Sequence, residues 1–334
     1  EQVDAYQIKF STGPLQGQER TILSNVGNNP AQIHPSAGDS IVTFLQRGDA
    51  PDSWDVYIEG FDRQNAIIWL VILFVATMIL LAGWQGVKVA LSIGISVGLI
   101  GYVLIPLFLA GWNPVPVAII LAGFFTVLSC GLSTGWDKKA MITALATIGG
   151  ALVAYLLSVI FVNWSHLAGL SSEEDRLFFQ KNPGLNPRGL LFAGIIIASA
   201  GVLEDVAVSI VSGISEVHRV NPRASFRDLF ISGMAVGRDH MAALANTLIY
   251  AYVGGSLSSL LLYKQYGQSW LKFINFDSVV DEIVRSLCGT IGLVFTIPIS
   301  AFLAASLISR SSWKDDSAPA HTHHGHSHGP HTRV

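Results

Sequence analysis

The sequence predicts a mainly α-helical, polytopic membrane protein, with a transmembrane bundle of about seven spans behind a small N-terminal β-domain. The 334 residues are 51% hydrophobic and only 13% charged, whereas soluble proteins carry about a quarter charged residues. Most of the charges lie before Arg63, in a few loops and at the C-terminus. A net charge of −3 gives no reason to expect a nucleic-acid partner. The first partner that we expect is the lipid bilayer.

Seven segments are long and apolar enough to cross a bilayer, which takes about 20 residues. Tryptophans such as Trp84, Trp112 and Trp164 fall near segment ends, where amphipathic rings favour the interface. The segments are approximately 66–83, 87–110, 116–133, 140–162, 190–214, 241–263 and 284–308. They define a helical domain over residues 62–310.

Residues 1–61 differ in composition and predict a β-domain, for which a barrel is one candidate form. "QIKF", "RTILSNV", "SIVTFL" and "WDVYIEG" are short and rich in β-branched and aromatic residues, and "STGPLQG", "GNNP" and "SAGD" separate them as turns. The segments 171–180 and 276–285 are amphipathic. Residues 311–334 predict a disordered, histidine-rich tail.

Charged loops predict the orientation in a cell inner (plasma) membrane. One set of alternate loops holds the tight basic clusters, so we expect it in the cytoplasm; it contains Lys88, Lys138, Lys139, Arg219, Arg223 and Arg227. The β-domain is then extracytoplasmic and the C-terminus cytoplasmic. An outward N-terminus is easier to make if an upstream signal or anchor helix carries it across.

The stretch "GVLEDVAVSIVSG" puts Glu204 and Asp205 inside an apolar segment, where an ionised carboxylate is costly unless it faces a cavity or a partner. A helix turns 100° per residue, so the side chains that lie within about 40° of one line along it can be counted. On this helix they are all small or polar: Gly194, Ala198, Gly201, Asp205, Ser209, Ser212 and Glu216. Such a row of residues either faces a water-filled path or lets another helix approach closely. Glu204 points about 100° away, so we expect it to pair elsewhere or to lie nearer a headgroup.

The next segment repeats the pattern. Arg238 and His240 flank its polar line on either side, and Thr247 follows Asn246. The line consists of Ser232, Ala235, Asp239, Ala243, Asn246 and Tyr250. Gly233 and Gly237 precede the charged triplet and favour a break in the helix there. Two purely structural interpretations stay open. In the first, Asp205 is a packing residue or pairs with Arg238 only to hold two helices together. In the second, Arg238, Asp239 and His240 only anchor the helix at a membrane interface. We interpret Gly149 and Gly150, and Gly94, Gly98 and Gly101, as packing notches.

The C-terminal run "HTHHGHSHGPH" holds six histidines in a Gly/Ser/Pro background. Neutral imidazole suits Zn, Ni, Cu and Co, so Zn or Ni is the candidate bound metal. The tail either collects or buffers a metal, or it is an incidental disordered end. The candidate ligands are His321, His323, His324, His326, His328 and His331.

The stretch from "NPRGLLFAGIIIASAGVLEDVAVSIVSG" to "GRDHMAALANTLIYAYVGG" resembles the YibE/F family of bacterial polytopic membrane proteins. The family pattern Asp-Val-Ala-x-Ser maps onto Asp205, Val206, Ala207 and Ser209. The patterns Gly-Arg-Asp-x-Met and Asn-Thr-Leu-Ile map onto Gly237, Arg238, Asp239 and Met241, and onto residues 246–249. Members usually carry a further N-terminal anchor helix, and at the position of Glu204 more often an apolar residue. The resemblance implies a permease without implying its substrate.

These observations favour a transporter of a small charged solute, with a divalent metal cation as first candidate and proton or sodium coupling through Asp205. One alternative is a non-transporting subunit that docks partners through its external β-domain. An intramembrane enzyme is less favoured because neither G-x-S-x-G nor H-E-x-x-H is present. We therefore expect no enzymatic activity. A homo-oligomer or a membrane partner remains an open alternative to a monomer.

Overall fold

The computed structural model describes residues 2–26, 33–47, 54–133, 135–265, 267 and 269–309. The chain divides into two compact units, Glu1–Gly83 and Trp84–Val334. Each unit is described by itself.

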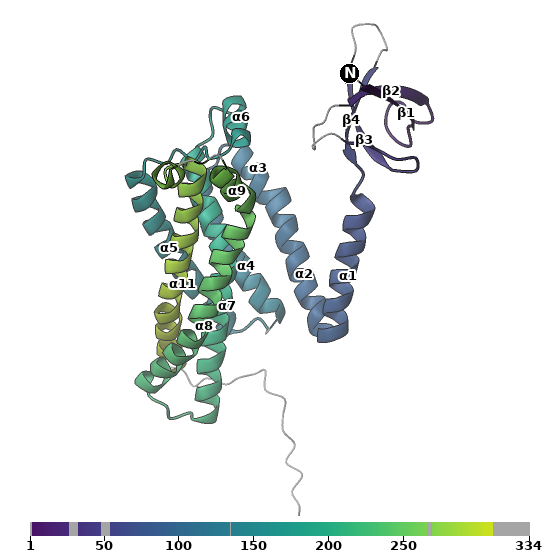
Figure 1. The fold of residues 1–334 in the computed structure, drawn as a ribbon. Coiled ribbons are helices and arrows are strands. Elements are labelled where there is room, and N and C mark those ends of the chain that lie inside the picture. The colour runs from purple at the N-terminus through teal and green to yellow at the C-terminus, as the bar shows by residue number, and fades with distance from the viewer. Residues whose placement is uncertain are drawn as a thin grey trace, which may run out of the picture. The chain divides into compact units, whose positions relative to one another are not determined.

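The first unit begins with two antiparallel hairpins (Figure 1). The strands are β1 (Gln2–Lys9), β2 (Glu19–Val26), β3 (Ile41–Arg47) and β4 (Trp54–Phe61). Gly13, Gly17 and Gly38 adopt positive φ angles in the turns, which glycine does at no steric cost. The four predicted strands and two of the predicted turns are confirmed, whereas "GNNP" lies outside the described residues.

The barrel expected as one form of this domain is not present among the described strands. β1 hydrogen-bonds with β2 and β3 with β4, which leaves two separate two-stranded sheets. A barrel requires every strand to pair with a neighbour on both sides. Four strands that pair two by two cannot meet that requirement.

Helix α1 (Gln64–Ala82) completes the first unit. None of its 19 residues is buried, and large apolar side chains such as Trp69, Leu70 and Leu80 are exposed around it. A helix that is apolar on all sides needs an apolar environment, which a bilayer supplies. This helix is the first of the predicted spans.

The second unit is helical throughout its described residues. Its long helices are α4 (Pro114–Ser133), α5 (Lys138–Trp164), α7 (Pro187–Val220), α8 (Phe226–Gly255) and α11 (Asp277–Ser309). The others are α2 (Trp84–Leu99), the π-helical turn η1 (Ile100–Leu104), α3 (Ile105–Leu109), α6 (Glu173–Lys181), α9 (Leu257–Gln265) and α10 (Trp270–Phe273). The predicted amphipathic segment 171–180 is α6, which a capping box of Ser172 and Asp175 begins.

Six helices in the described part of the chain are long and apolar enough to span a membrane. They are α1, the continuous run 84–109, α4, α5, α7 and α11. Helix α8 is not among them, because Arg238, Asp239, His240 and Asn246 interrupt its apolar sequence. It nevertheless runs alongside α7 and α11 (Figure 1), and its 30 residues extend about 45 Å. The predicted number of about seven spans is therefore reached only if α8 also crosses.

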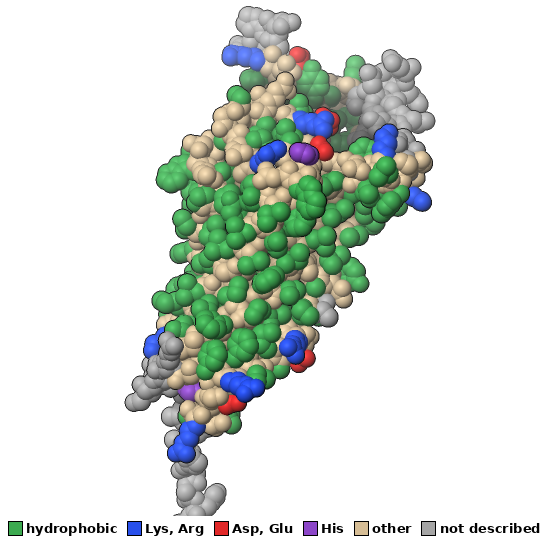
Figure 2. All heavy atoms as spheres, turned by 90° about the vertical axis from the view of Figure 1, so that its left-hand side faces the viewer, with side chains coloured by type: hydrophobic (Ala, Val, Ile, Leu, Met, Phe, Trp, Pro, Cys, Tyr) green, Lys and Arg blue, Asp and Glu red, His purple; other side chains and the backbone are tan. Residues whose placement is uncertain are grey.

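The surface of the second unit fits a membrane environment. One face shows a broad hydrophobic band free of charged side chains, with charged groups at both ends (Figure 2). The α7–α8 turn lies at one end of the bundle, and α6 and α9 lie at the other (Figure 1). Which end faces the cytoplasm stays a prediction.

Helices α5, α7, α8 and α11 pack around the core. The predicted notch at Gly150 is confirmed, because a Cβ on Gly150 would meet the Thr296 hydroxyl and one on Gly292 would lie 3.0 Å from the Gly150 carbonyl oxygen. The three glycines of the second predicted span are different. Gly94, Gly98 and Gly101 have open space where a Cβ would lie, so no contact among the described residues uses them.

The predicted break in α8 is wrong. The helix runs unbroken through Gly233 and Gly237, and both glycines are buried against neighbouring helices. A Cβ on Gly233 would lie 2.5 Å from Ile214 of α7 and 3.1 Å from Ala301 of α11, and one on Gly237 would meet Ile297. Close helix packing, and not a change of backbone direction, explains these glycines.

Candidate functional site

Helix α7 carries the first group of predicted site residues. Asn186 caps its N-terminus by accepting a hydrogen bond from the Gly189 amide, and Pro187 occupies its first turn. The predicted small and polar line faces out of the bundle along most of its length: Ala198, Gly201, Asp205, Ser212 and Glu216 are exposed. The opposite side is buried and contains Ile196, Leu203, Ile210 and Ile214.

Helix α8 carries the second group, and its polar line is also exposed. Asp239, Ala243, Asn246 and Tyr250 are all exposed. Two nearby hydroxyl groups donate hydrogen bonds to the backbone of their own helix. Ser209 donates to the Asp205 carbonyl oxygen at 2.8 Å, and Thr247, next to Asn246, donates to the Ala243 carbonyl oxygen at 2.9 Å.

The two lines lie level with each other. Gly213 lies opposite Val236, Gly237 opposite Ile210 and Gly233 opposite Ile214, as in an antiparallel helix pair. Extending this pairing turn by turn places Ser209 level with Asp239, Asp205 level with Ala243 and Gly201 level with Asn246.

Each line also faces away from α11. Helix α11 contacts α8 at Gly237, about 160° around that helix from Asp239, and approaches α7 at Ser199, about 120° from Asp205. Helix α8 contacts α7 at Ile210, about 140° around α7 from Asp205, so the α7 line also faces away from α8. We call the two level, exposed lines together the α7–α8 polar face and define it as Gly201, Asp205, Ser209, Ser212, Asp239, Ala243 and Asn246.

Arg238 and His240 flank this face and do not join it. Arg238 is exposed and points about 100° from Asp239, and none of the ion pairs among the described residues includes it. The His240 ring nitrogen Nδ1 lies 2.9 Å from the Val236 carbonyl oxygen. The structure thus places Ser209 level with Asp239 and Asp205 level with Ala243 on neighbouring helices, and leaves Arg238 to one side.

Glu204 points into the bundle, toward α4. Its side chain is half-buried, and its polar neighbours on α4 are Ser129, Thr126 and the Cys130 thiol. Cys130 and Cys288 are buried free cysteines. Of two adjacent acids, the one inside the bundle is Glu204, and the exposed one is Asp205.

A further charged cluster lies where α11 begins. Asp281 is only 5% exposed; its Oδ2 accepts hydrogen bonds from the Ser171 hydroxyl at 3.0 Å and from Arg285 at 3.3 Å. The Glu282 carboxylate lies 3.7 Å from the Arg285 Nε. Arg285 reaches α7 at Gly194, where a Cβ would lie 3.0 Å from its guanidinium.

Sequence reasoning missed this cluster as a site, although it noted the amphipathic segment 276–285. The signal was present in the spacing, since Asp281 and Glu282 precede Arg285 by four and three residues and such neighbours meet on one helix face. The contact with Ser171 joins residues far apart in the sequence, and no local pattern predicts it.

Metal ligands do not gather in the described part of the chain, where no group of three or more His, Cys, Asp or Glu side chains could hold a metal ion. The six tail histidines proposed as ligands, His321–His331, lie outside the described residues. The Zn or Ni site predicted for them stays a prediction.

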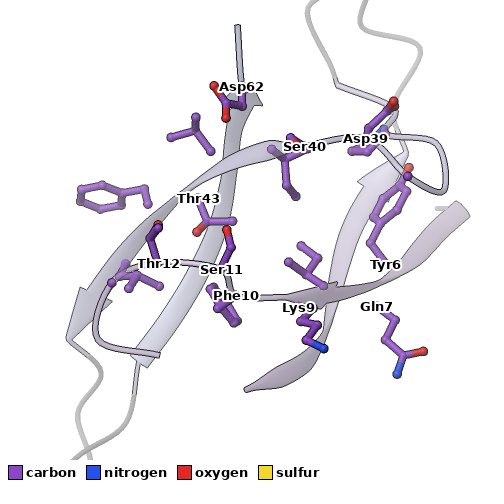
Figure 3. A pocket seen from close by; sticks show the side chains of 18 of the residues that line it. Tyr6, Gln7, Lys9, Phe10, Ser11, Thr12, Asp39, Ser40, Thr43 and Asp62 are labelled. Carbon is purple, nitrogen blue, oxygen red and sulfur yellow. The ribbon is translucent and has the colours of Figure 1, made fainter. Parts of the chain in front are cut away.

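The first unit contains an open cleft of about 1200 Å³ between its two hairpins. Figure 3 shows side chains from both hairpins along it, among them Tyr6, Lys9, Ser40 and Asp62. Outside the cleft's lining, Leu23 and Tyr57 are also exposed on the strands. This unit therefore offers a mixed polar and apolar surface.

One comparison with known proteins yields a match. A family model described as YibE/F-like protein matches residues 70–310, which include the α7–α8 polar face and the Asp281 cluster. No curated protein and no solved structure matches the chain.

Proposed function

Because the chain belongs to the YibE/F-like protein family and is a multi-pass membrane protein, we propose that it is a permease for a small charged solute. The α7–α8 polar face is the path along which the solute moves in this proposal. No chemical conversion of the solute is part of it.

The observation that carries the proposal is that two exposed, acidic, small-residue lines lie level with each other on neighbouring helices. An ionised carboxylate that faces hydrocarbon costs several kcal/mol, and Asp205 and Asp239 lie level with the middle of two long helices. Such a face is stable in a bilayer only when water or protein covers it. We propose that a second copy of the chain or a membrane partner covers it and encloses a polar path.

The charges of this face favour a cation as the solute. Asp205 and Asp239 supply negative charge, and Asn246 and the serines supply neutral oxygen atoms. Carboxylate and neutral oxygen ligands suit hard divalent cations. We propose a divalent metal cation as the first solute to test: the oxygen ligands of the face suit Mg²⁺, Ca²⁺ or Mn²⁺, and the histidines of the tail suit Zn or Ni.

Transport by the purified chain in liposomes tests the proposal. Zn²⁺ uptake, followed by Ni²⁺, is compared between wild type, Asp205→Asn and Asp239→Asn. We expect each variant to lose at least about tenfold in rate, because the amide keeps the shape and removes the charge. Asp277→Asn, an exposed acid at the start of α11, is the matched control and should transport normally. Wild-type rates in Asp205→Asn would contradict the proposal.

A second candidate function rests on the cleft between the hairpins. A cleft with a volume of about 1200 Å³ and exposed aromatic side chains suits a partner protein better than a metal ion. In that case the chain is a non-transporting subunit and the first unit is its docking module. Stoichiometric co-purification of a partner, together with no uptake by the chain alone, would favour this second candidate.

A further inference from the structure

A second cleft, of about 500 Å³, lies within the helical unit, at the end of the bundle that carries α6 (Figure 1). Three stretches of chain line it: α3 with the turn into α4, the end of α6, and the loop that leads into α7. We call it the α3–α6 cleft. Its volume lies within the range of about 300–1000 Å³ that small-molecule sites occupy. Its apolar wall contains Phe108, Leu109, Trp112, Phe178, Phe179 and Leu190.

The cleft lies at the level where the membrane meets water. The candidate span 84–109 ends beside it, and the candidate spans α4 and α7 begin beside it at Pro114 and Pro187. Trp112 is exposed, and a tryptophan at the end of a span is typical of the interface. Ile105 and Leu109 line the cleft and are themselves exposed on α3. The apolar wall therefore continues onto the surface that faces lipid.

Local structure holds the aromatic wall in place. Phe178 and Phe179 contact each other edge to face, with ring centroids 5.2 Å apart, an arrangement that aromatic pairs prefer. Gly111 turns the chain after α3 with a φ of 82°, which glycine adopts without strain. The Trp112 amide then donates to the Leu107 carbonyl oxygen at 3.1 Å. The cleft is therefore preformed.

Two asparagines supply its polar part. Asn113 Oδ1 accepts a hydrogen bond from the Val115 amide at 3.2 Å, and Asn186 Oδ1 accepts one from the Gly189 amide at 3.1 Å. A Cβ on Gly189 would lie 3.2 Å from Asn186 Nδ2 and 3.3 Å from Pro114, so the two helix starts are neighbours.

The side-chain amide nitrogens of both asparagines remain available to a ligand. An asparagine amide has two N–H donors, and no hydrogen bond within the described part of the chain uses those of Asn113 or Asn186. Both residues line the cleft, and none of the described residues that line it is charged. The cleft thus suits a ligand with an apolar body and a neutral hydrogen-bond acceptor.

We propose that the α3–α6 cleft binds one phospholipid of the bilayer, with an acyl chain against the aromatic wall and an ester carbonyl oxygen at Asn113 and Asn186. An ester carbonyl is a neutral acceptor attached directly to an apolar chain. In a bilayer it lies between the headgroups and the hydrocarbon, which is the level of the cleft. The site goes beyond the proposed transport function, because it needs neither the polar face nor a solute.

Two lipids that differ only at the ester test the site. Dioleoyl phosphatidylcholine has ester carbonyls, and its diether analogue has none. The full chain, purified and delipidated in detergent, is titrated with each lipid, and native mass spectrometry counts the bound molecules. We expect one saturable site that binds the diester about three- to tenfold more tightly, because it gains one or two neutral hydrogen bonds. Glycerophosphocholine, the soluble headgroup, should not compete.

Conservative variants connect the ester preference to the asparagines. Asn113→Asp combined with Asn186→Asp keeps both helix caps, since aspartate caps as well as asparagine, and removes the amide donors. We expect this double variant to bind the two lipids equally. Asn221→Asp is the matched control, because Asn221 is exposed at the other end of α7 and its Oδ1 accepts from the Arg223 amide. It should keep the preference of wild type.

Gly184→Trp tests the cleft itself and keeps the test decisive if the double variant fails to fold. Gly184 lines the cleft and has open space where a Cβ would lie, so a bulky side chain fits there and takes up the volume. We expect the saturable lipid to be lost and Tm in detergent to stay unchanged.

Three results would each overturn the proposal: equal affinity of wild type for the two lipids, an ester preference that survives in the double variant, or an unchanged lipid count in Gly184→Trp. Competition by glycerophosphocholine would also overturn it, in favour of a soluble ligand. None of these results depends on solute uptake, so they are distinguishable from failure of the permease proposal.

Discussion

The side chains of Glu204 and Asp205 leave α7 about 100° apart, and this angle gives two adjacent acids different surroundings. Glu204 meets the hydroxyls of α4 inside the bundle, whereas Asp205 lies on the exposed polar face. A polar residue within a span is costly unless it is covered. We infer that Asp205, and not Glu204, belongs to the proposed solute path.

Asp281 and Arg285 form an ion pair at 3.3 Å in which the carboxylate is buried and the guanidinium half-buried, with side chains 7% and 26% exposed. Arg285→Gln should lower the free energy of unfolding by about 2–3 kcal/mol, because it leaves a buried carboxylate without its positive partner. Adding Asp281→Asn should recover a large part of the loss, since the double variant has no unpaired charge. Chemical denaturation of both variants in detergent measures the effect.

The double variant distinguishes this pairing from simple packing. Additive losses in Arg285→Gln and Asp281→Asn would mean that the two side chains do not stabilise each other. In that case the cluster around Ser171 would owe its position to the surrounding helices alone.

Helix α8 is the element whose relation to the membrane matters most, because its sequence is too polar for the usual criterion of a span. Its position beside α7 and α11 (Figure 1) predicts that it crosses. Single cysteines at Arg223, three residues before α8, and at Gln265, the last residue of the following helix α9, are both exposed. They should then react with an impermeant thiol reagent from opposite sides of the membrane. Lysed cells, in which both positions should react, provide the control. Labelling of both from the same side would contradict a crossing α8.

The sequence allowed the strands and most spans to be predicted, because they depend on local periodicity and hydropathy. The sequence did not show whether the helix breaks or continues at Gly233 and Gly237, because these glycines pack against Ile214 and Ile297 of other helices. The polar lines were predictable as lines, because 100° per residue is fixed by geometry.

The direction in which a polar line faces was not predictable in the same way. It depends on where α4 and α11 pack against α7 and α8, and those contacts join residues far apart in the chain. For the same reason, the partners of Glu204 on α4 and the contact between Ser171 and Asp281 appear only in three dimensions.

The chain as a whole combines a membrane-embedded bundle with a small strand unit and a histidine-rich end. The family match covers residues 70–310, so the polar face and the Asp281 cluster belong to the family region. The β-hairpins and the tail lie outside it. We therefore place the general function in the bundle and expect the two ends to adapt it to a particular partner or metal.

The central claim is that the α7–α8 polar face contacts water within the membrane. Thiols react as thiolates, so a charged, water-soluble thiol reagent modifies only cysteines that water reaches. In native membranes, and in a chain whose Cys130 and Cys288 are replaced by alanine, single cysteines at Ser209, Ser212 and Ala243 should react readily. A cysteine at Leu152, exposed near the middle of α5, should face lipid and stay unmodified. Equal lack of reaction at all four positions would contradict a polar path along α7 and α8.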